Sequence, residues 1–153
     1  MSAATAFQSP FPCAYDEDFY AWAFTTAALL RQGRFTEIDI EHLAEEIEDM
    51  GKRDRRSLKS HMRNVLLHLL KWHYQPDKRS PSWRQSIRNG RIEIEELLRD
   101  SPSLARQLLA IINEEYPAAR ADAVDETGLP EDTFPTQCPF TPEQVLDTGL
   151  EPE

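Results

Sequence analysis

The stretch that decides the fold is DIEHLAEEIEDMGKRDRRSLKSHMRNVLLHLLKWHYQP, residues 39–76. Its apolar side chains recur every three or four positions, which is the spacing of one face of an α-helix. Pro76 ends the pattern because proline lacks the amide hydrogen that a helix interior uses. The stretch therefore predicts one long helix as the spine of the fold, with these repeating positions: Ile40, Leu43, Ile47, Met50, Leu58, Met62, Val65, Leu66, Leu69 and Trp72.

Gly51 is the point at which this helix could break, since it opens the polar run GKRDRRS between the two apolar sets. Glu48 with Lys52 and Asp49 with Arg53 are oppositely charged pairs four residues apart, and both pairs span the glycine. An isolated glycine costs a helix only about 1 kcal/mol relative to alanine. We therefore expect a continuous, bent helix whose acidic first third docks in the bundle.

Proline and glycine divide the rest of the chain into further helices. Gly33 and Gly128 suit helix C-termini, and Ser80 before Pro81 suits an N-terminus. Pro117 is expected to kink or split the helix that contains it. The expected helices cover about 16–32, 81–99 and 102–126, with a capping box at 141–144 that starts a short last one.

The inward positions of these helices follow from the same periodicity. The first is expected to bury Phe19, Trp22, Ala23, Thr26, Ala27 and Leu30; the third Trp83, Ile87, Ile94, Leu97 and Leu98; the fourth Leu104, Leu108, Ile111, Ile112 and Tyr116. No strand pattern, phosphate-binding glycine loop or internal repeat occurs. The prediction is an all-α fold, an irregular bundle of four to five helices with one long, bent central helix. We expect a single domain over 15–148, flanked by flexible segments at 1–14 and 149–153.

The formal charge of −10 is unevenly distributed along the chain. Residues 52–91 contain twelve basic and two acidic residues, a charge of +10, and the remainder carries −20. Such segregation indicates either a nucleic-acid surface or a basic segment that packs on acidic helices of this chain or of another copy. The candidate partner surface consists of Lys52, Arg53, Arg55, Arg56, Lys59 and Arg63. Because the chain as a whole is acidic and has no readout motif, a protein partner or self-association as a homodimer is favoured over nucleic acid.

The sequence contains no secretory signal and no apolar run of the roughly 20 residues that a membrane span needs. Cys13 and Cys138 belong to no metal-ligand or redox motif, which favours reduced thiols over a disulfide between them. We expect a cytoplasmic protein with no membrane partner.

A divalent metal site is the sharpest chemical hypothesis, since His and carboxylate side chains on bundle helices can converge on one ion. His42 and Glu45 are three residues apart and could share an ion, whereas His68 would need ligands from elsewhere, such as Asp16, Asp18 or Glu45. The candidate ligands are therefore His68, Glu45 and His42. The favoured alternative is a half-buried histidine whose ring nitrogens bond to a carboxylate or backbone group on a neighbouring helix, with no cofactor. Glu45, Glu46 and Glu48 likewise suggest either acid–base chemistry or, more simply, ion pairs with arginines such as Arg55.

Several short runs of sequence along the chain resemble those of a known protein family. They are YDEDFYAW at 15–22, LAEEIE at 43–48 with Met50-Gly51, HLLKW at 68–72 with YQP at 74–76, Ser80 with Trp83, SPSL at 101–104, ETGLP at 126–130 and Cys138-Pro139. In these runs the chain resembles the bacterial family called domain of unknown function 29, over about residues 15–148. The resemblance implies a helical, cytosolic protein without an assigned activity, and it assigns no catalytic residue.

These observations favour a small non-enzymatic interaction or regulatory protein that self-associates. One alternative is a metal-binding helical-bundle enzyme centred on His68 and Glu45. A second is a nucleic-acid-binding protein that uses the basic segment 52–63.

Overall fold

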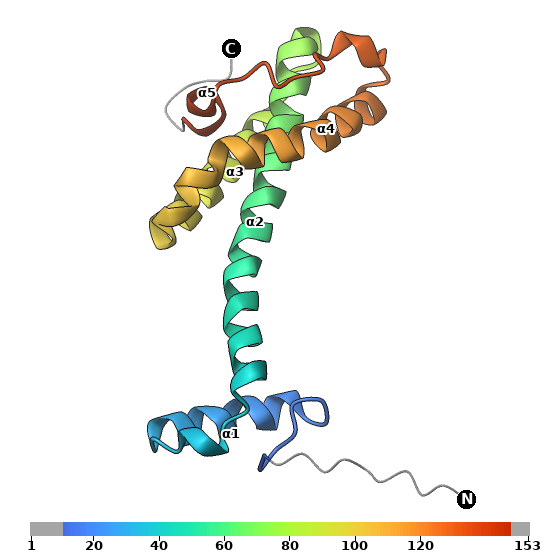
Figure 1. Cartoon of the computed structure of the whole chain (residues 1–153). Coiled ribbons are helices and arrows are strands. Elements are labelled where there is room, and N and C mark those ends of the chain that lie inside the picture. Colours follow the sequence, from blue (N-terminus) through green and yellow to red (C-terminus); the bar gives the residue numbers. More distant parts are fainter. Residues whose placement is uncertain (1–10, 148–153) are drawn as a thin grey trace, which may run out of the picture. The chain divides into compact units, whose positions relative to one another are not determined.

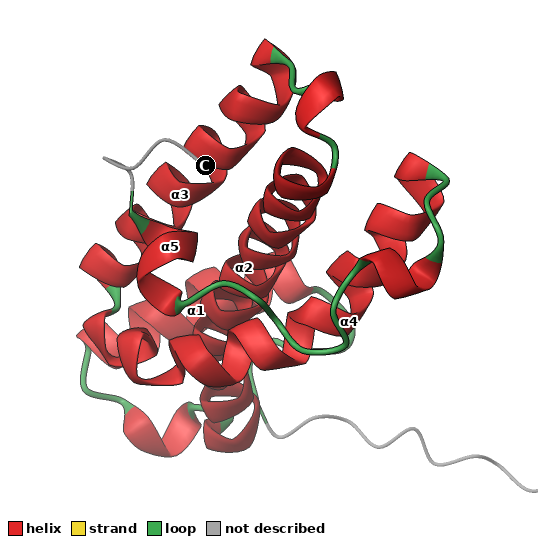
Figure 2. Ribbon diagram, turned by 90° about the horizontal axis from the view of Figure 1, so that it is seen from above, coloured by secondary structure: helices red, strands yellow, loops and turns green. Residues whose placement is uncertain are grey.

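The computed structural model describes residues 11–147, and all regular structure within that range is helical (Figures 1 and 2). The expected flexible segments at 1–14 and 149–153 lie mostly or wholly outside it. The α-helices are α1 (Phe19–Arg31), α2 (Ile40–Tyr74), α3 (Pro81–Asp100), α4 (Leu108–Thr127) and α5 (Pro142–Leu146), and 3-10 helices cover Phe35–Glu37, Pro76–Lys78, Pro102–Gln107 and Glu131–Thr133. The all-α prediction is confirmed, and no helix in the described range is long and apolar enough to cross a membrane.

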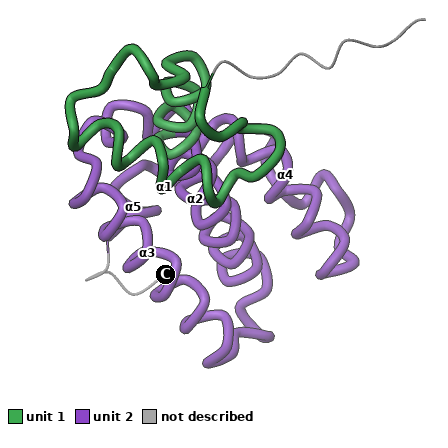
Figure 3. Tube along the Cα trace, turned by 90° about the horizontal axis from the view of Figure 1, so that it is seen from below, with its two compact units in different colours: residues 1–51 green, residues 52–153 purple. Residues whose placement is uncertain are grey.

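The chain divides into two compact units, residues 1–51 and residues 52–153 (Figure 3). Helix α2 passes through the boundary at Gly51 as one α-helix of 35 residues, which confirms the expected continuity. The bend in α2 and the single domain over 15–148 stay predictions.

In the first unit, α1 is fixed at both ends by local polar groups. The Asp18 side chain accepts a hydrogen bond from the Ala21 amide at 2.9 Å, and Gly33 after the helix has a φ of 68°, a left-handed conformation that glycine adopts readily. The helix buries Trp22, Thr26 and Leu29. The prediction that Phe19 and Leu30 are inward is wrong, because the buried stripe runs at a spacing of four and three from Trp22 and leaves both exposed.

The first turns of α2 leave their apolar side chains in solvent. Ile40, Ile47 and Met50 are 55%, 60% and 61% exposed. The prediction that this acidic third docks in the bundle is therefore wrong for these three residues. The described part of the first unit contains no α-helix other than α1 to cover them.

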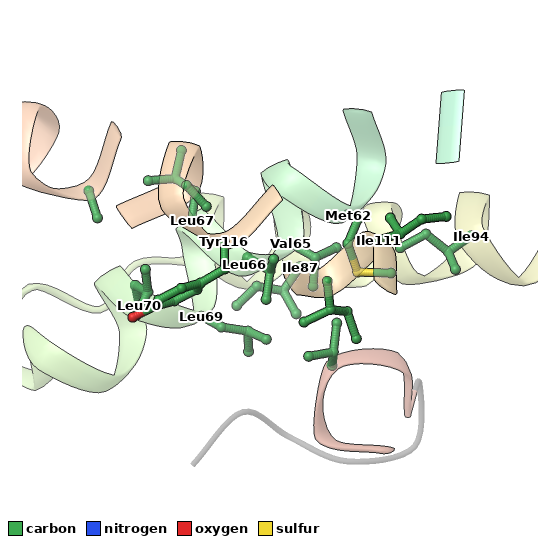
Figure 4. Packing of buried hydrophobic residues seen from close by; sticks show 14 of the residues in the cluster. Met62, Val65, Leu66, Leu67, Leu69, Leu70, Ile87, Ile94, Ile111 and Tyr116 are labelled. Carbon is green, nitrogen blue, oxygen red and sulfur yellow. The ribbon is translucent and has the colours of Figure 1, made fainter. Parts of the chain in front are cut away.

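In the second unit, the apolar face of α2 between Leu58 and Trp72 forms the core with α3, α4 and the C-terminal segment (Figure 4). The predicted inward positions on α3 and α4 are confirmed as buried or packed on the core. Each large apolar side chain buried in this way stabilises the fold by about 1.5–3 kcal/mol. The largest fully buried side chains are Leu58, Met62, Val65, Leu66, Leu70, Ile87, Ile94, Ile111, Ile112, Tyr116, Phe134 and Val145.

The fourth predicted helix differs in two ways from the expectation. Pro102–Gln107 form a 3-10 helix that buries Leu104, so that α4 begins at Leu108. Pro117 lies inside α4 and does not split it. Tyr116 and Ala119 on either side of the proline are buried, and their packing offsets the hydrogen bond that proline removes.

At Gly90, α3 packs directly against α2. A Cβ atom added at Gly90 would lie 2.4 Å from Cγ2 of Val65, a fully buried, β-branched side chain with little freedom to move. The glycine therefore permits the packing of the two helices. At Gly51, by contrast, an added Cβ atom meets nothing within 4 Å.

These two glycines predict opposite effects of one substitution. Gly90→Ala should lower the free energy of unfolding by roughly 1–3 kcal/mol through overpacking. Gly51→Ala, the matched control, should raise it by up to about 1 kcal/mol because alanine favours the helix. Urea denaturation followed by circular dichroism measures both, and a Gly90→Ala variant as stable as the parent would contradict the close contact.

Candidate functional site

A cluster of polar and aromatic side chains surrounds the start of α2 in the first unit. The Asp39 side chain caps the helix, because its Oδ1 accepts a hydrogen bond from the His42 amide at 3.3 Å. Its Oδ2 lies 2.6 Å from Nδ1 of His42, and this hydrogen bond raises the pKa of His42. Glu45 and Asp16 add further negative potential that acts in the same direction.

Tyr15 links the chain before α1 to the same helix. Its ring stacks on His42 with centroids 4.1 Å apart and meets the edge of Trp22 at 5.0 Å. Its hydroxyl donates a hydrogen bond to the Glu46 carboxylate, and this bond is the main reason that the pKa of Tyr15 rises to about 12. Tyr15 is therefore a neutral donor at ordinary pH, and the cluster fastens the preceding chain to α2.

The three candidate metal ligands do not form one site in the described structure. Nδ1 of His42 is engaged by Asp39, and Nδ1 of His68 lies 2.8 Å from the backbone oxygen of Asn64, one turn earlier in α2. Glu45 is exposed. Within residues 11–147, no three His, Cys, Asp or Glu side chains are placed to hold an ion together. The metal site stays a prediction, and both histidine contacts lie within α2 and its N-cap, not on a neighbouring helix as the alternative expected.

The basic segment of α2 pairs with the acidic side of α4 within the second unit. Arg55 contacts Glu114 at 2.9 Å, Lys59 contacts Glu115 at 3.1 Å, and Arg63 holds both carboxylate oxygens of Asp122 at 2.7 and 2.9 Å. Lys71 extends the series to Glu126 at 2.7 Å. The partner numbers rise together, so α2 and α4 run in the same direction along this contact. We call these four pairs the α2–α4 ladder.

The α2–α4 ladder changes the interpretation of the basic segment 52–63. Arg55 also bonds Gln107, so its side chain is directed at the 3-10 helix and α4 and not at the acids of residues 45–48. Hydrogen bonds lower the pKa of Glu114, through Arg55, and raise those of Lys59 and Arg63, through Glu115 and Asp122. Of the six candidate partner residues, Arg55, Lys59 and Arg63 thus bond acids of α4, and Arg63 is exposed, as are Lys52, Arg53 and Arg56. Whether the segment binds a partner stays a prediction.

One pocket in the second unit offers little chemistry. It measures about 230 Å³, and its lining includes Arg120, Asp125 and Glu131 beside Pro117, Ala121 and Val124. The Arg120 guanidinium donates to the backbone oxygens of Phe134 and Glu131 and to the Glu131 carboxylate. Its donors thus hold the loop after α4 in place.

Arg91 has a role that the sequence reading missed. It is only 3% exposed, and it donates from Nε to the Val145 oxygen at 2.9 Å and from Nη2 to the Gln144 oxygen at 2.6 Å. Burial lowers the pKa of this guanidinium. The available signal was its spacing, because Arg91 lies four residues after Ile87 and three before Ile94, on the inward face of α3.

The environment of His42 predicts a pH-dependent stability of the first unit. Because the folded-state pKa exceeds the ordinary value of 6.5, the contribution is fully present below that pH and is lost as pH rises through the folded pKa. Asp39→Asn keeps a capping side chain but removes the charge, so the pKa of His42 should fall. Titration of the His42 ring by NMR tests this, and an unchanged pKa in the variant would contradict the Asp39 contact.

The burial of Arg91 predicts that its substitution lowers the stability of the fold far more than substitution of Arg88 on the same helix. Arg91→Ala should destabilise the second unit by on the order of 2–4 kcal/mol, because two carbonyls lose a donor and the side-chain volume is left empty. Arg88→Ala, an exposed position on the same helix, should change stability by no more than about 0.5 kcal/mol. If Arg91→Ala and Arg88→Ala lowered the free energy of unfolding equally in chemical denaturation, the structural role of the buried Arg91 would be contradicted.

Comparison with known proteins gives one match. No curated protein and no solved structure matches the chain. The family described as "Domain of unknown function DUF29" matches residues 14–150, nearly the whole chain, in agreement with the resemblance found in the sequence. The chain therefore belongs to the DUF29 family.

Proposed function

We propose that this chain is a non-enzymatic interaction protein that self-associates. The observation that carries the proposal is the distribution of exposed apolar side chains. Within residues 11–147, eight of the ten large apolar side chains that remain exposed lie between Phe19 and Met50, in the smaller unit. Single exposed apolar residues are ordinary, whereas a concentration in one short segment is typical of a protein interaction surface. The eight are Phe19, Tyr20, Phe24, Leu30, Phe35, Ile40, Ile47 and Met50.

The charge of the same unit indicates the chemistry of its partner. Residues 1–51 contain ten acidic and two basic residues, a formal charge of −8. A surface that is both apolar and acidic attracts a basic surface with apolar contacts of its own. The basic start of the second unit, where Arg53 and Arg56 are exposed, supplies such charge on another copy of the chain.

The α2–α4 ladder bears on the nucleic-acid alternative. Phosphate binding requires several free cationic side chains close together. Because Arg55, Lys59 and Arg63 bond acids of α4, the continuous basic surface that the alternative needs is reduced. This favours a protein partner.

Self-association predicts a native mass that depends on concentration. Sedimentation equilibrium and light scattering across a wide concentration range should give a mass that rises above the 17.6 kDa of one chain. Added salt should weaken the association, because part of the attraction is between exposed charges. A strict monomer at every concentration, at low and at moderate salt, would rule the proposal out.

A further inference from the structure

We infer that two copies of this chain pair antiparallel through residues 40–56 of α2, with Ile47 and Met50 at the centre of the contact. The inference rests on the proposed self-association and names the surface that performs it. Three observations support it. They are the exposed apolar stripe, the order of the charges, and the agreement between the two-fold axis that the stripe implies and the one that the charges imply.

The exposed stripe is the continuation of a face that α2 buries elsewhere. Ile40, Ile47 and Leu58 are separated by seven and eleven residues, which are close to two and three turns of an α-helix. Leu58 is fully buried in the core of the second unit, whereas Ile40 and Ile47 on the same helix face are more than half exposed. The helix face that is buried at Leu58 therefore carries two exposed apolar side chains, Ile40 and Ile47, before it, and between them and Leu58 it carries Gly51 and polar residues.

The surroundings of Ile47 suit contact with another helix. Ala44 and Gly51 lie three residues before it and four residues after it, on the same face, and both are exposed. Gly51 has open space where a side chain would be. Small residues on either side of a large one allow the backbone of a partner helix to approach closely, so that Ile47 can fill the gap between the partner's side chains.

The charges on this segment fix the direction of the partner helix. Apart from Glu46, which accepts from Tyr15, and Arg55, which bonds Glu114, the charges are ordered in two blocks. The acids Glu41, Glu45, Glu48 and Asp49 are followed by the bases Lys52, Arg53 and Arg56, with Asp54 among them. Parallel pairing would place acids beside acids and bases beside bases. Antiparallel pairing places each acidic block beside the basic block of the other copy, which is the favourable arrangement.

The apolar stripe and the charge blocks imply nearly the same two-fold axis. The acidic block is centred at about residue 46 and the basic block at about residue 54, so opposing them places the axis near residue 50. Opposing Ile47 of one copy to Met50 of the other places it between residues 48 and 49. In a two-fold contact each pair occurs twice, so Met50 also meets Ile47 of the other copy. The two estimates differ by less than half a helical turn.

The apolar centre is tested by a matched pair of variants. Ile47→Asp should make the protein monomeric, because it places a charge in the contact. Leu109→Asp, at a position on α4 with 59% exposure against 60% at Ile47, should leave the association unchanged. Circular dichroism shows whether both variants keep the helical fold, and sedimentation equilibrium gives their masses.

The outcomes separate this inference from the proposed function. A wild-type dimer whose mass is unaffected by Ile47→Asp would overturn the α2 contact and leave self-association standing. A wild-type monomer would overturn both. A monomer that retards duplex DNA or tRNA on a gel, and loses this property in Arg53→Glu/Arg56→Glu, would replace both with nucleic-acid binding.

The antiparallel direction is tested by reversing charges in two variants. Arg53→Glu/Arg56→Glu makes the second block net acidic, and Glu41→Lys/Glu45→Lys leaves the first block nearly neutral. Each variant alone should associate at least tenfold more weakly than the parent. Mixing the two should restore part of the association, since the intact acidic block of one variant then faces the intact basic block of the other. If either variant alone dimerises as well as the parent, or if the mixture stays monomeric, the antiparallel arrangement is wrong.

Discussion

The structure depends on how the apolar face of α2 is removed from water. Between Leu58 and Trp72 this face is covered by α3, α4 and the C-terminal segment, and Gly90 lets α3 come against Val65. Arg91 holds the last short helix to the same core through two carbonyl oxygens. Between Ile40 and Met50 the face carries exposed side chains. The covered core of the second unit and the exposed apolar side chains at the start of α2 are the observations that support the proposed function in binding.

The segregation of charge has a structural role along one part of α2 and a different one along another. Arg55, Lys59, Arg63 and Lys71 bond acids of α4, so they fix how the two helices lie together. Such exposed pairs contribute little net stability but disfavour other registers. Between Glu41 and Arg56, a block of acids is followed by a block of bases along one helix, and we propose that an antiparallel partner helix binds this order of charges.

The helices and most of the core could be predicted from the sequence because proline, glycine and apolar period act locally. Pro76, Ser80-Pro81 and Gly128 mark helix ends where they were expected, and the glycine at 51 interrupts nothing. The burial of Ile40, Ile47 and Met50 was predicted wrongly because periodicity identifies a face and not what covers it. Sequence spacing could not predict the partners of Arg55 and Arg63, because these depend on side-chain distances between packed helices. It also could not predict the contact of His68 with its own helix. Arg91 was overlooked because its charge was weighed more heavily than its inward position.

The most direct test of this account is a distance between two copies of α2. In a Cys13→Ser/Cys138→Ser background, spin labels are attached in one variant at Met50→Cys and in another at Ile40→Cys, and electron paramagnetic resonance measures the distance between copies. Antiparallel pairing predicts a short distance for residue 50 and a much longer one for residue 40, because the two labels at residue 40 would be separated by about 27 Å of helical rise. Short distances at both positions, or no distance between copies at either, would contradict it.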